Sequence, residues 1–302
     1  MAHVPADPYA ALRPAPVLQR VWGWLAVGNF FLGGTAAAAY VLALLLALWP
    51  GVTPAPLLGV VQRLAPLLVL AGFGAVALEA GRPLRGLRVL WNLRHSWMSR
   101  ELLAGLVFVL LAWADALWPR AALRLLAGLA ALGLLVSQGL ILFHARGVPA
   151  WHQRRVPTLF VSSGLLTGTA LLLGLAALLA TEARALALLA GLAFALAAAD
   201  LGLWWAYLHQ PARVPEVALA CQRLRRWPLL VSTVGVGHLL PLLLLGSWLA
   251  QPTASPLRLL ATSIALLLGG WSLKAGLVTK AGYLFGIPVP RLSGRPPAGG
   301  AP

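Results

Sequence analysis

Eight apolar runs, each long enough to cross a bilayer, constrain the fold of this chain more than any other feature. A membrane-spanning helix needs about 20 mostly apolar residues. The runs are Val21–Trp49, Leu57–Ala80, Glu101–Trp118, Leu123–His144, Val156–Ala180, Ala185–Tyr207, Trp227–Ala250 and Leu257–Lys280. Only 10% of the 302 residues are charged, whereas soluble domains carry about 25%. The sequence therefore predicts an all-α, polytopic membrane protein with an eight-transmembrane-helix bundle.

The limits of the runs divide the chain into three parts. Residues 1–20 form an N-terminal tail, residues 21–280 form the transmembrane domain, and residues 281–302 form a Pro- and Gly-rich tail that we expect to be mobile. The first run is longer than a signal-peptide core and has no clear small-residue cleavage site at its end. We therefore expect it to be retained as the first helix.

The connections between the runs alternate in charge. Those after the first, third, fifth and seventh runs are short and nearly neutral, whereas those after the second, fourth and sixth are longer and basic. Eight spans place both chain ends on the side of these basic connections, here termed the basic face. The positive-inside rule assigns this face to the cytoplasm and predicts a multi-pass protein of the cell inner (cytoplasmic) membrane. Arginines that bind a partner protein would produce the same bias.

The same composition limits the partners and cofactors. The formal net charge of +16 follows the topology pattern, so we expect membrane lipid around the chain and no nucleic acid as a partner. The single cysteine, Cys221, cannot form an intrachain disulfide or hold an iron–sulfur cluster, which needs about four ligands. No residues have zinc-ligand spacing, so we expect no metal site. We also expect no haem, although His144, His209 and His238 leave a bis-histidine site open.

The connection Ala77–Gly105 concentrates charge in this otherwise apolar chain. It carries Glu79 and Glu101 at the two hydrocarbon edges, where a carboxylate is tolerated if something pairs with it or uses it. Its arginines are Arg82, Arg85, Arg88, Arg94 and Arg100. We interpret this stretch as the rim of a ligand pocket and as a binding surface for a partner protein.

Most intramembrane polar residues fall in the half of the bilayer next to the basic face, because successive helices alternate in direction. Asn29, Glu79, Glu101 and His144 all lie there. Glu101 falls in the first turn of its helix, where free N–H groups favour a carboxylate, and it could also pair with Arg100 or Arg94. Glu79 ends its helix, where the helix dipole opposes a negative charge. We therefore rank Glu79 above Glu101 as a functional carboxylate.

Three further polar residues lie deeper in the membrane. Asp200 and Lys274 could form an ion pair between helices or contribute to a ligand site, and His238 could be a hydrogen-bonded histidine inside the bundle. Intramembrane ionisable residues also mark transport pathways. One function class to test is therefore a small-solute transporter that uses Asp200, His238 and Lys274.

Several motifs resemble those of a known family. Glu79–Pro83 (Glu-Ala-Gly-Arg-Pro), Trp91–Leu93 (Trp-Asn-Leu) and Ser96–Glu101 (Ser-Trp-Met-Ser-Arg-Glu) resemble a signature of the membrane anchor subunits of DMSO-reductase-type molybdoenzymes. The wider NrfD/polysulfide reductase anchor superfamily shares part of this signature. Supporting similarities are found in Asn29–Thr35, Val148–Trp151, Gly270–Lys274 and Val278–Tyr283.

The resemblance implies a function as well as a fold. It implies an eight-helix anchor without a prosthetic group of its own, which binds menaquinol as an exchangeable substrate. It also implies two partners: a four-cluster ferredoxin-like iron–sulfur subunit and a molybdopterin catalytic subunit. Some family members have a histidine, implicated in quinol binding, two residues before the glycine of this motif, where this chain has Glu79.

The residues and the resemblance together give a hypothesis for each candidate site residue. We expect Glu79, and next Glu101, to accept quinol protons. Asn29 and His144 would hydrogen-bond quinol oxygens, and Arg82 and Arg100 would complete the site. Arg82, Arg85 and Arg88 would stabilise the anionic quinol intermediate or meet acidic groups on the partner. The alternatives are the solute transporter and a purely structural anchor without a quinone.

Overall fold

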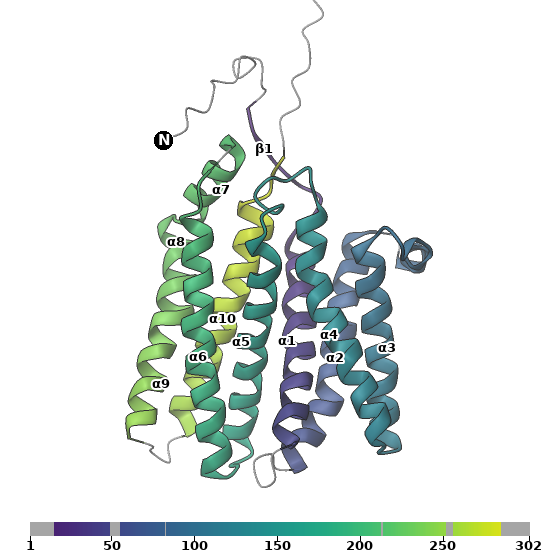
Figure 1. Cartoon of the computed structure of the whole chain (residues 1–302), viewed down its shortest axis with the longest axis vertical. Coiled ribbons are helices and arrows are strands. Elements are labelled where there is room, and N and C mark those ends of the chain that lie inside the picture. The colour runs from purple at the N-terminus through teal and green to yellow at the C-terminus, as the bar shows by residue number, and fades with distance from the viewer. Residues whose placement is uncertain (1–14, 49–54, 82, 213, 252–255, 285–302) are drawn as a thin grey trace, which may run out of the picture.

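The computed structural model describes residues 15–48, 55–81, 83–212, 214–251 and 256–284. In these ranges the chain forms one bundle of long helices that run side by side (Figure 1). The first six are α1 (Trp24–Ala47), α2 (Ala55–Glu79), α3 (Trp97–Leu117), α4 (Ala121–His144), α5 (Arg155–Leu178) and α6 (Ala183–Leu208). A short helix α7 (Pro215–Leu224) follows at the basic face, and the last two long helices are composite.

Both composite helices contain a π-helical segment. The first runs through α8 (Trp227–Leu230), the π-helix η3 (Val231–Leu239) and α9 (Leu240–Ala250). The second joins α10 (Pro256–Ala275) to the π-helix η4 (Gly276–Lys280). The apolar runs predicted both helices, but hydropathy carries no signal for the wider π-helical turn. Such turns occur frequently at functional sites.

Seven helices in the described part of the chain are long and apolar enough to span a membrane. The prediction of an all-α, polytopic membrane protein is therefore confirmed. The remaining long helix, α3, carries Arg100, Glu101 and Asp115 within its 21 residues and is not among these seven. It lies against α4 and α2.

Helix α1 forms the centre of the bundle and packs against α2, α4, α5 and α10. Residues 33–43 are all buried, and its stretch of four alanines, Ala36–Ala39, lets a neighbouring helix come close. At Gly168 of α5, an added Cβ would lie 2.6 Å from the backbone nitrogen of Ala39. This backbone-to-backbone contact explains why α5 has a glycine there, as small residues permit close helix packing in membranes.

The two ends of the described chain meet at the basic face. Strand β1 (Val17–Leu18) pairs antiparallel with β2 (Tyr283–Leu284). The Gln19 amide Nε2 also donates to the backbone carbonyl of Val278 at 3.0 Å. Most of the two predicted tails, residues 1–14 and 285–302, lies outside the described residues. The strand pairing of the inner ends was not anticipated from the sequence.

Candidate functional site

A buried hydrogen-bonded cluster joins α1, α3 and α4 near the basic face. The Glu101 carboxylate is 6% exposed, and its Oε1 accepts from Asn29 Nδ2 at 3.0 Å and from Gln138 Nε2 at 3.2 Å. Gln138 Nε2 also donates to the backbone oxygen of Asn29 at 3.3 Å. Both bonds to the carboxylate use Oε1, so Oε2 makes no hydrogen bond within the described residues and stays available to a ligand.

This cluster forms the inner end of a cavity of about 200 Å³. Asn29 and Glu101 line it together with apolar and aromatic side chains. The apolar and aromatic lining residues are Val21, Trp22, Ala26, Phe30, Val76, Ala80, Met98 and Ile141. Glu79 lines the cavity as well. Asn29 Oδ1 is buried and has no hydrogen-bond partner among the described groups. Asn29 and Glu101 are therefore the polar side chains at the inner end of an otherwise largely apolar cavity.

Glu79 lies at the outer rim of the same cavity and has a local structural role. Helix α2 ends at Glu79, and Gly81 follows with a φ of 65°, the left-handed conformation that commonly ends helices. The Glu79 carboxylate accepts a hydrogen bond from the backbone N–H of Gly23, the N-cap residue of α1. The positive end of the α1 dipole thus offsets the unfavourable dipole of α2. Our ranking of Glu79 above Glu101 overlooked this contact.

The start of α3 also differs from expectation. Ser96 is the N-cap, and its side chain accepts from the N–H of Ser99 at 3.3 Å. Helix α3 begins at Trp97, so Glu101 lies beyond the first turn, and our prediction that the helix terminus holds it was wrong. The possible pairing with Arg100 or Arg94 is also absent from the described contacts of Glu101. Two side-chain amides hold the carboxylate instead.

The other predicted site residues are not in this cavity. The Arg100 guanidinium donates to the backbone oxygens of Leu93 and Arg94 at 2.9 and 2.8 Å and lies over the Trp97 ring. His144 is exposed, and its Nδ1 lies 2.9 Å from the backbone oxygen of Leu140. Arg82 lies outside the described residues. The structure therefore brings together Asn29, Glu79 and Glu101 of the predicted set.

Sequence reasoning missed Gln138. A glutamine among leucines in the middle of an apolar run costs free energy unless it is hydrogen-bonded, which was the available signal. Gly33 and Gly34 of α1 gave a second signal. An added Cβ would lie 2.6 Å from Gln138 Nε2 at Gly33 and 2.9 Å from Gln138 Oε1 at Gly34. These glycines make room for the Gln138 amide.

A second buried polar cluster lies in the other half of the bundle. His238 Nε2 lies 3.0 Å from Asp200 Oδ2, and Lys274 Nζ donates to Ser163 Oγ at 2.8 Å. Asp200, His238 and Lys274 are each at most 1% exposed. The described contacts of Asp200 thus include His238 rather than the Lys274 bond that the sequence suggested. None of the three lines the cavity above or the larger pocket beside Arg154 and Arg155.

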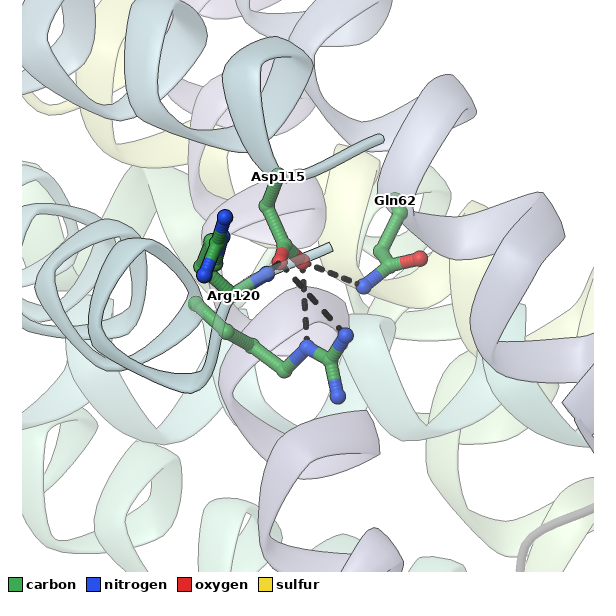
Figure 2. Close-up of polar contacts among 4 residues, drawn as sticks. Gln62, Asp115 and Arg120 are labelled. Atoms are coloured by element: carbon green, nitrogen blue, oxygen red, sulfur yellow. Dashed lines mark hydrogen bonds and ion pairs between the residues drawn. The ribbon is translucent and has the colours of Figure 1, made fainter. Parts of the chain in front are cut away.

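A third buried carboxylate, Asp115, closes the opposite end of α3. Figure 2 shows Gln62 and Arg120 converging on it. Asp115 Oδ2 accepts from Gln62 Nε2 at 2.7 Å and from Arg124 Nε at 3.0 Å, and Oδ1 accepts from the Arg120 backbone N–H at 3.0 Å. This carboxylate has an ion-pair partner and lines neither pocket described above. It is the structural counterpart to Glu101 on the same helix.

Comparison with known proteins identifies a family for this chain. The family model described as "Polysulphide reductase, NrfD" matches residues 14–287. The chain belongs to the NrfD family. A search of curated proteins found no match. NrfD membership confirms the predicted anchor superfamily and a multi-pass membrane protein. Proteins of the NrfD family are membrane subunits that typically pair with iron–sulfur and catalytic subunits.

Proposed function

We propose that this NrfD-family chain is the quinol-binding anchor of a molybdopterin oxidoreductase complex in the inner membrane. Menaquinol would bind in the cavity between α1, α2 and α3 and give its electrons to a four-cluster iron–sulfur subunit at the basic face. That subunit would connect to a molybdopterin catalytic subunit. In this arrangement α3 is the eighth membrane-spanning helix, because it runs beside α4 along the bundle (Figure 1).

The observation that carries the proposal is the position of Glu101 at the inner end of an otherwise apolar cavity. Ligand pockets are typically apolar, with a few placed polar groups that fix orientation. Oxidation of a quinol to a quinone releases two electrons and two protons, so the site needs a proton acceptor. Glu101 Oε2 makes no hydrogen bond within the described residues, and Asn29 Oδ1 can accept from a quinol hydroxyl.

The two carboxylates then have successive roles. Glu101, the deeper and more buried, accepts the proton from the quinol hydroxyl that Asn29 orients. Glu79 lies at the rim, half-buried, and passes the proton to water at the basic face. Trp22 and Phe30 form an aromatic wall, with ring centroids 5.8 Å apart, against which a quinone ring can pack. The apolar tail would remain in lipid.

The exposed part of the α2–α3 connection suits a partner protein. Arg88, Trp91 and Arg94 are exposed at the basic face, and Trp91 is 84% exposed. Aromatic and arginine side chains are enriched in protein interfaces. This surface lies at the end of the bundle that holds the cavity, so electrons would leave the quinol by a short route.

A matched pair of substitutions on α3 tests the proposal. Glu101→Gln keeps the shape of the side chain and removes its basicity, and we expect quinol-dependent turnover to fall roughly 10²-fold or more. Asp115→Asn removes the other buried carboxylate of the same helix and should leave turnover near that of the unmodified complex. Both complexes would be checked for assembly, and their lipid extracts analysed for quinone. Equal turnover in the two variants, or no quinone with the purified complex, would refute the assignment.

The structure favours this proposal over a solute transporter. A transported solute needs a cavity among its binding groups, and neither described pocket is lined by Asp200, His238 or Lys274. Close backbone contact between η3 and α10 also limits the space there. An added Cβ at Gly237 would lie 2.4 Å from the Cα of Gly269.

A further inference from the structure

The larger pocket beside Arg154 and Arg155 is separate from the cavity proposed for quinol. It has a volume of about 890 Å³ and is lined by residues of α4, α5, α6, α7 and their connections. The described residues that line the two pockets form two separate sets. In Figure 1, α6 and α7 lie on the opposite side of the bundle from α3. A ligand of this pocket would therefore be distinct from the quinol.

The pocket carries positive charge that is not neutralised within the described residues. Arg154 and Arg155 both line it, are exposed, and their side chains make no ion pair or hydrogen bond in the described part of the chain. There is no carboxylate among its described lining residues. Glu216, which precedes the lining residue Val217, is 2% exposed and is not one of them. Because a guanidinium is always charged and matches the geometry of phosphate oxygens, the pocket suits an anion of this kind.

The start of α5 adds to the preference for an anion. Arg154 is the N-cap residue of this helix and makes no side-chain capping bond. Thr158, in the first turn, also lines the pocket. The positive end of a helix dipole favours a negative charge and opposes a positive one, so two arginines at this end lower the stability of α5 when nothing is bound. A bound anion would reverse that effect.

A buried amide without a hydrogen-bond partner is the second indication of a ligand. Gln210 lines the pocket and is 9% exposed, and its Nε2 has no partner among the described groups. Its neighbour Cys221 offers only sulfur, which is a weak acceptor. An amide hydrogen that is buried without an acceptor costs free energy. An oxygen of a bound ligand would provide the missing acceptor.

The connection between α4 and α5 forms a fixed polar wall of the pocket. His152 Nδ1 lies 2.6 Å from the Phe143 carbonyl oxygen, and the two rings stack with their centroids 4.8 Å apart. Gln153 Nε2 donates to the Pro149 carbonyl oxygen at 2.9 Å. A carbonyl oxygen only accepts, so His152 Nδ1 carries a hydrogen and Nε2 remains available to a ligand. These contacts hold the wall in place before any ligand binds.

The depth of the pocket distinguishes a lipid from a soluble anion. Leu203 lines it from α6, five residues before that helix ends at Leu208. Helix α6 is long and apolar enough to span a membrane, and its Trp205 is 57% exposed. Tryptophan side chains of membrane helices gather at the level of the lipid head groups. The pocket thus joins arginines at the basic face to apolar side chains on the bilayer side, and its volume is in the range for organic ligands.

We propose that this pocket binds the phosphate head group of an anionic membrane phospholipid. Arg154 and Arg155 would pair with the phosphate oxygens, and Gln210 Nε2 would donate to an oxygen of the head group. The acyl chains would lie along α6. Basic pockets between membrane helices bind anionic head groups in this way. The lipid would hold α7 and the α4–α5 connection against the ends of α5 and α6, and its binding does not depend on the quinol.

The experiment is native mass spectrometry of the full chain in detergent, titrated with phosphatidylglycerol or phosphatidylcholine. We expect one phosphatidylglycerol to bind more tightly than any phosphatidylcholine and to remain bound in an equal concentration of inorganic phosphate. Arg154→Gln together with Arg155→Gln should weaken this binding roughly 10-fold or more. The control is Arg223→Gln together with Arg226→Gln, which removes two exposed arginines of the same face that do not line the pocket. Its affinity should match that of the unmodified chain.

Gln210→Met separates binding from structural support. It removes a donor without a partner, so we expect the affinity for phosphatidylglycerol to fall several-fold while the thermal unfolding temperature stays equal or rises. A lower unfolding temperature with unchanged affinity would exclude Gln210 from the site and overturn the proposal.

Three further results would overturn the lipid site. The first is equal affinity for phosphatidylglycerol in the two double variants. The second is displacement of the lipid by an equal concentration of inorganic phosphate, which would indicate a site for a free anion. The third is loss of the iron–sulfur subunit from the complex of the Arg154 and Arg155 variant with unchanged lipid binding, which would assign the pocket to an acidic segment of that partner. A complex without quinol turnover would refute the proposed function and leave these measurements unaffected.

Discussion

Gln138 Nε2 lies 3.2 Å from Oε1 of Glu101, so a side-chain amide in the middle of an apolar helix holds the one carboxylate at the inner end of the cavity. The same geometry recurs at the opposite end of the bundle, where Gln62 Nε2 lies 2.7 Å from Asp115 Oδ2. Among the described residues, α3 thus carries two buried carboxylates that each accept from a glutamine of a neighbouring helix, Glu101 at the cavity and Asp115 in an ion-pair cluster.

Substitution of each glutamine can distinguish an effect on stability from an effect on quinol turnover. Gln138→Leu removes a donor to Glu101 and should lower the free energy of unfolding by about 1–3 kcal/mol, measured by thermal unfolding in detergent. Gln62→Leu should lower stability to a similar extent. Quinol turnover should fall at least several-fold in Gln138→Leu alone, because Glu101 and Asn29 lose their common donor. A comparable loss in both variants would mean that turnover follows stability rather than the site.

The contact between Glu79 and Gly23 predicts different outcomes for two substitutions at one position. Glu79→Gln keeps an oxygen acceptor for the Gly23 N–H, so stability should change little. Glu79→Leu removes it and should cost about 0.5–2 kcal/mol, as loss of a helix cap does. If Glu79 also transfers protons, quinol turnover should fall in both variants. Turnover that falls only in Glu79→Leu would restrict Glu79 to the support of α1.

The close contact between Gly237 and Gly269 predicts that a larger side chain at position 237 causes a large loss of stability. Gly237→Ala places a methyl group against the backbone of Gly269, and separation of η3 from α10 should cost at least 1–3 kcal/mol, as overpacking does. The control is Gly191→Ala in α6, where nothing lies within 4 Å of an added Cβ. That variant should be neutral or slightly stabilising, because alanine favours a helix by about 1 kcal/mol over glycine. Thermal unfolding of the two proteins would reveal the difference.

The exposed arginines at the basic face predict salt-sensitive partner binding. Arg88→Glu together with Arg94→Glu should weaken retention of the iron–sulfur subunit on washed membranes, most clearly at moderate ionic strength, because charges at an interface rim act on association. The fold should be unaffected, since both side chains are exposed. Arg63→Glu, an exposed arginine in the opposite half of α2, serves as the control. Partner retention that is equal in all three proteins would place the interface elsewhere.

Hydropathy was sufficient to predict the helices, because a bilayer requires runs of about 20 apolar residues whatever their packing. Position along alternating helices was also enough to group Asn29, Glu79 and Glu101 near one face. Position along a helix does not tell which way a side chain faces around the helix axis, and His144 and Arg100 face away from the cavity. Nor could it supply partners from distant helices, such as Gly23 for Glu79 and Gln138 for Glu101.

The π-helical segments could not be predicted from the sequence for a different reason. Their sequences, Val231–Leu239 and Gly276–Lys280, have the composition of ordinary membrane helix. One extra residue per turn depends on tertiary contacts, such as the Trp151 indole that donates to the Leu277 carbonyl at 2.7 Å. The roles of Asp200, His238 and Lys274 in the second cluster likewise depend on which atoms face each other, and only the structure gives that.

The pairing of β1 with β2 determines when, during synthesis, the cavity can be completed. Trp22 is part of the cavity wall, and it is followed along the chain by α1, which the ribosome produces first. The segment just before it is held by Val278, Gly282 and Tyr283, which are produced last. Insertion of α1 therefore precedes completion of the cavity by the synthesis of all the helices between α1 and η4. A nascent chain can have α1 to α9 in the membrane and still lack a finished site until α10 and η4 have been inserted.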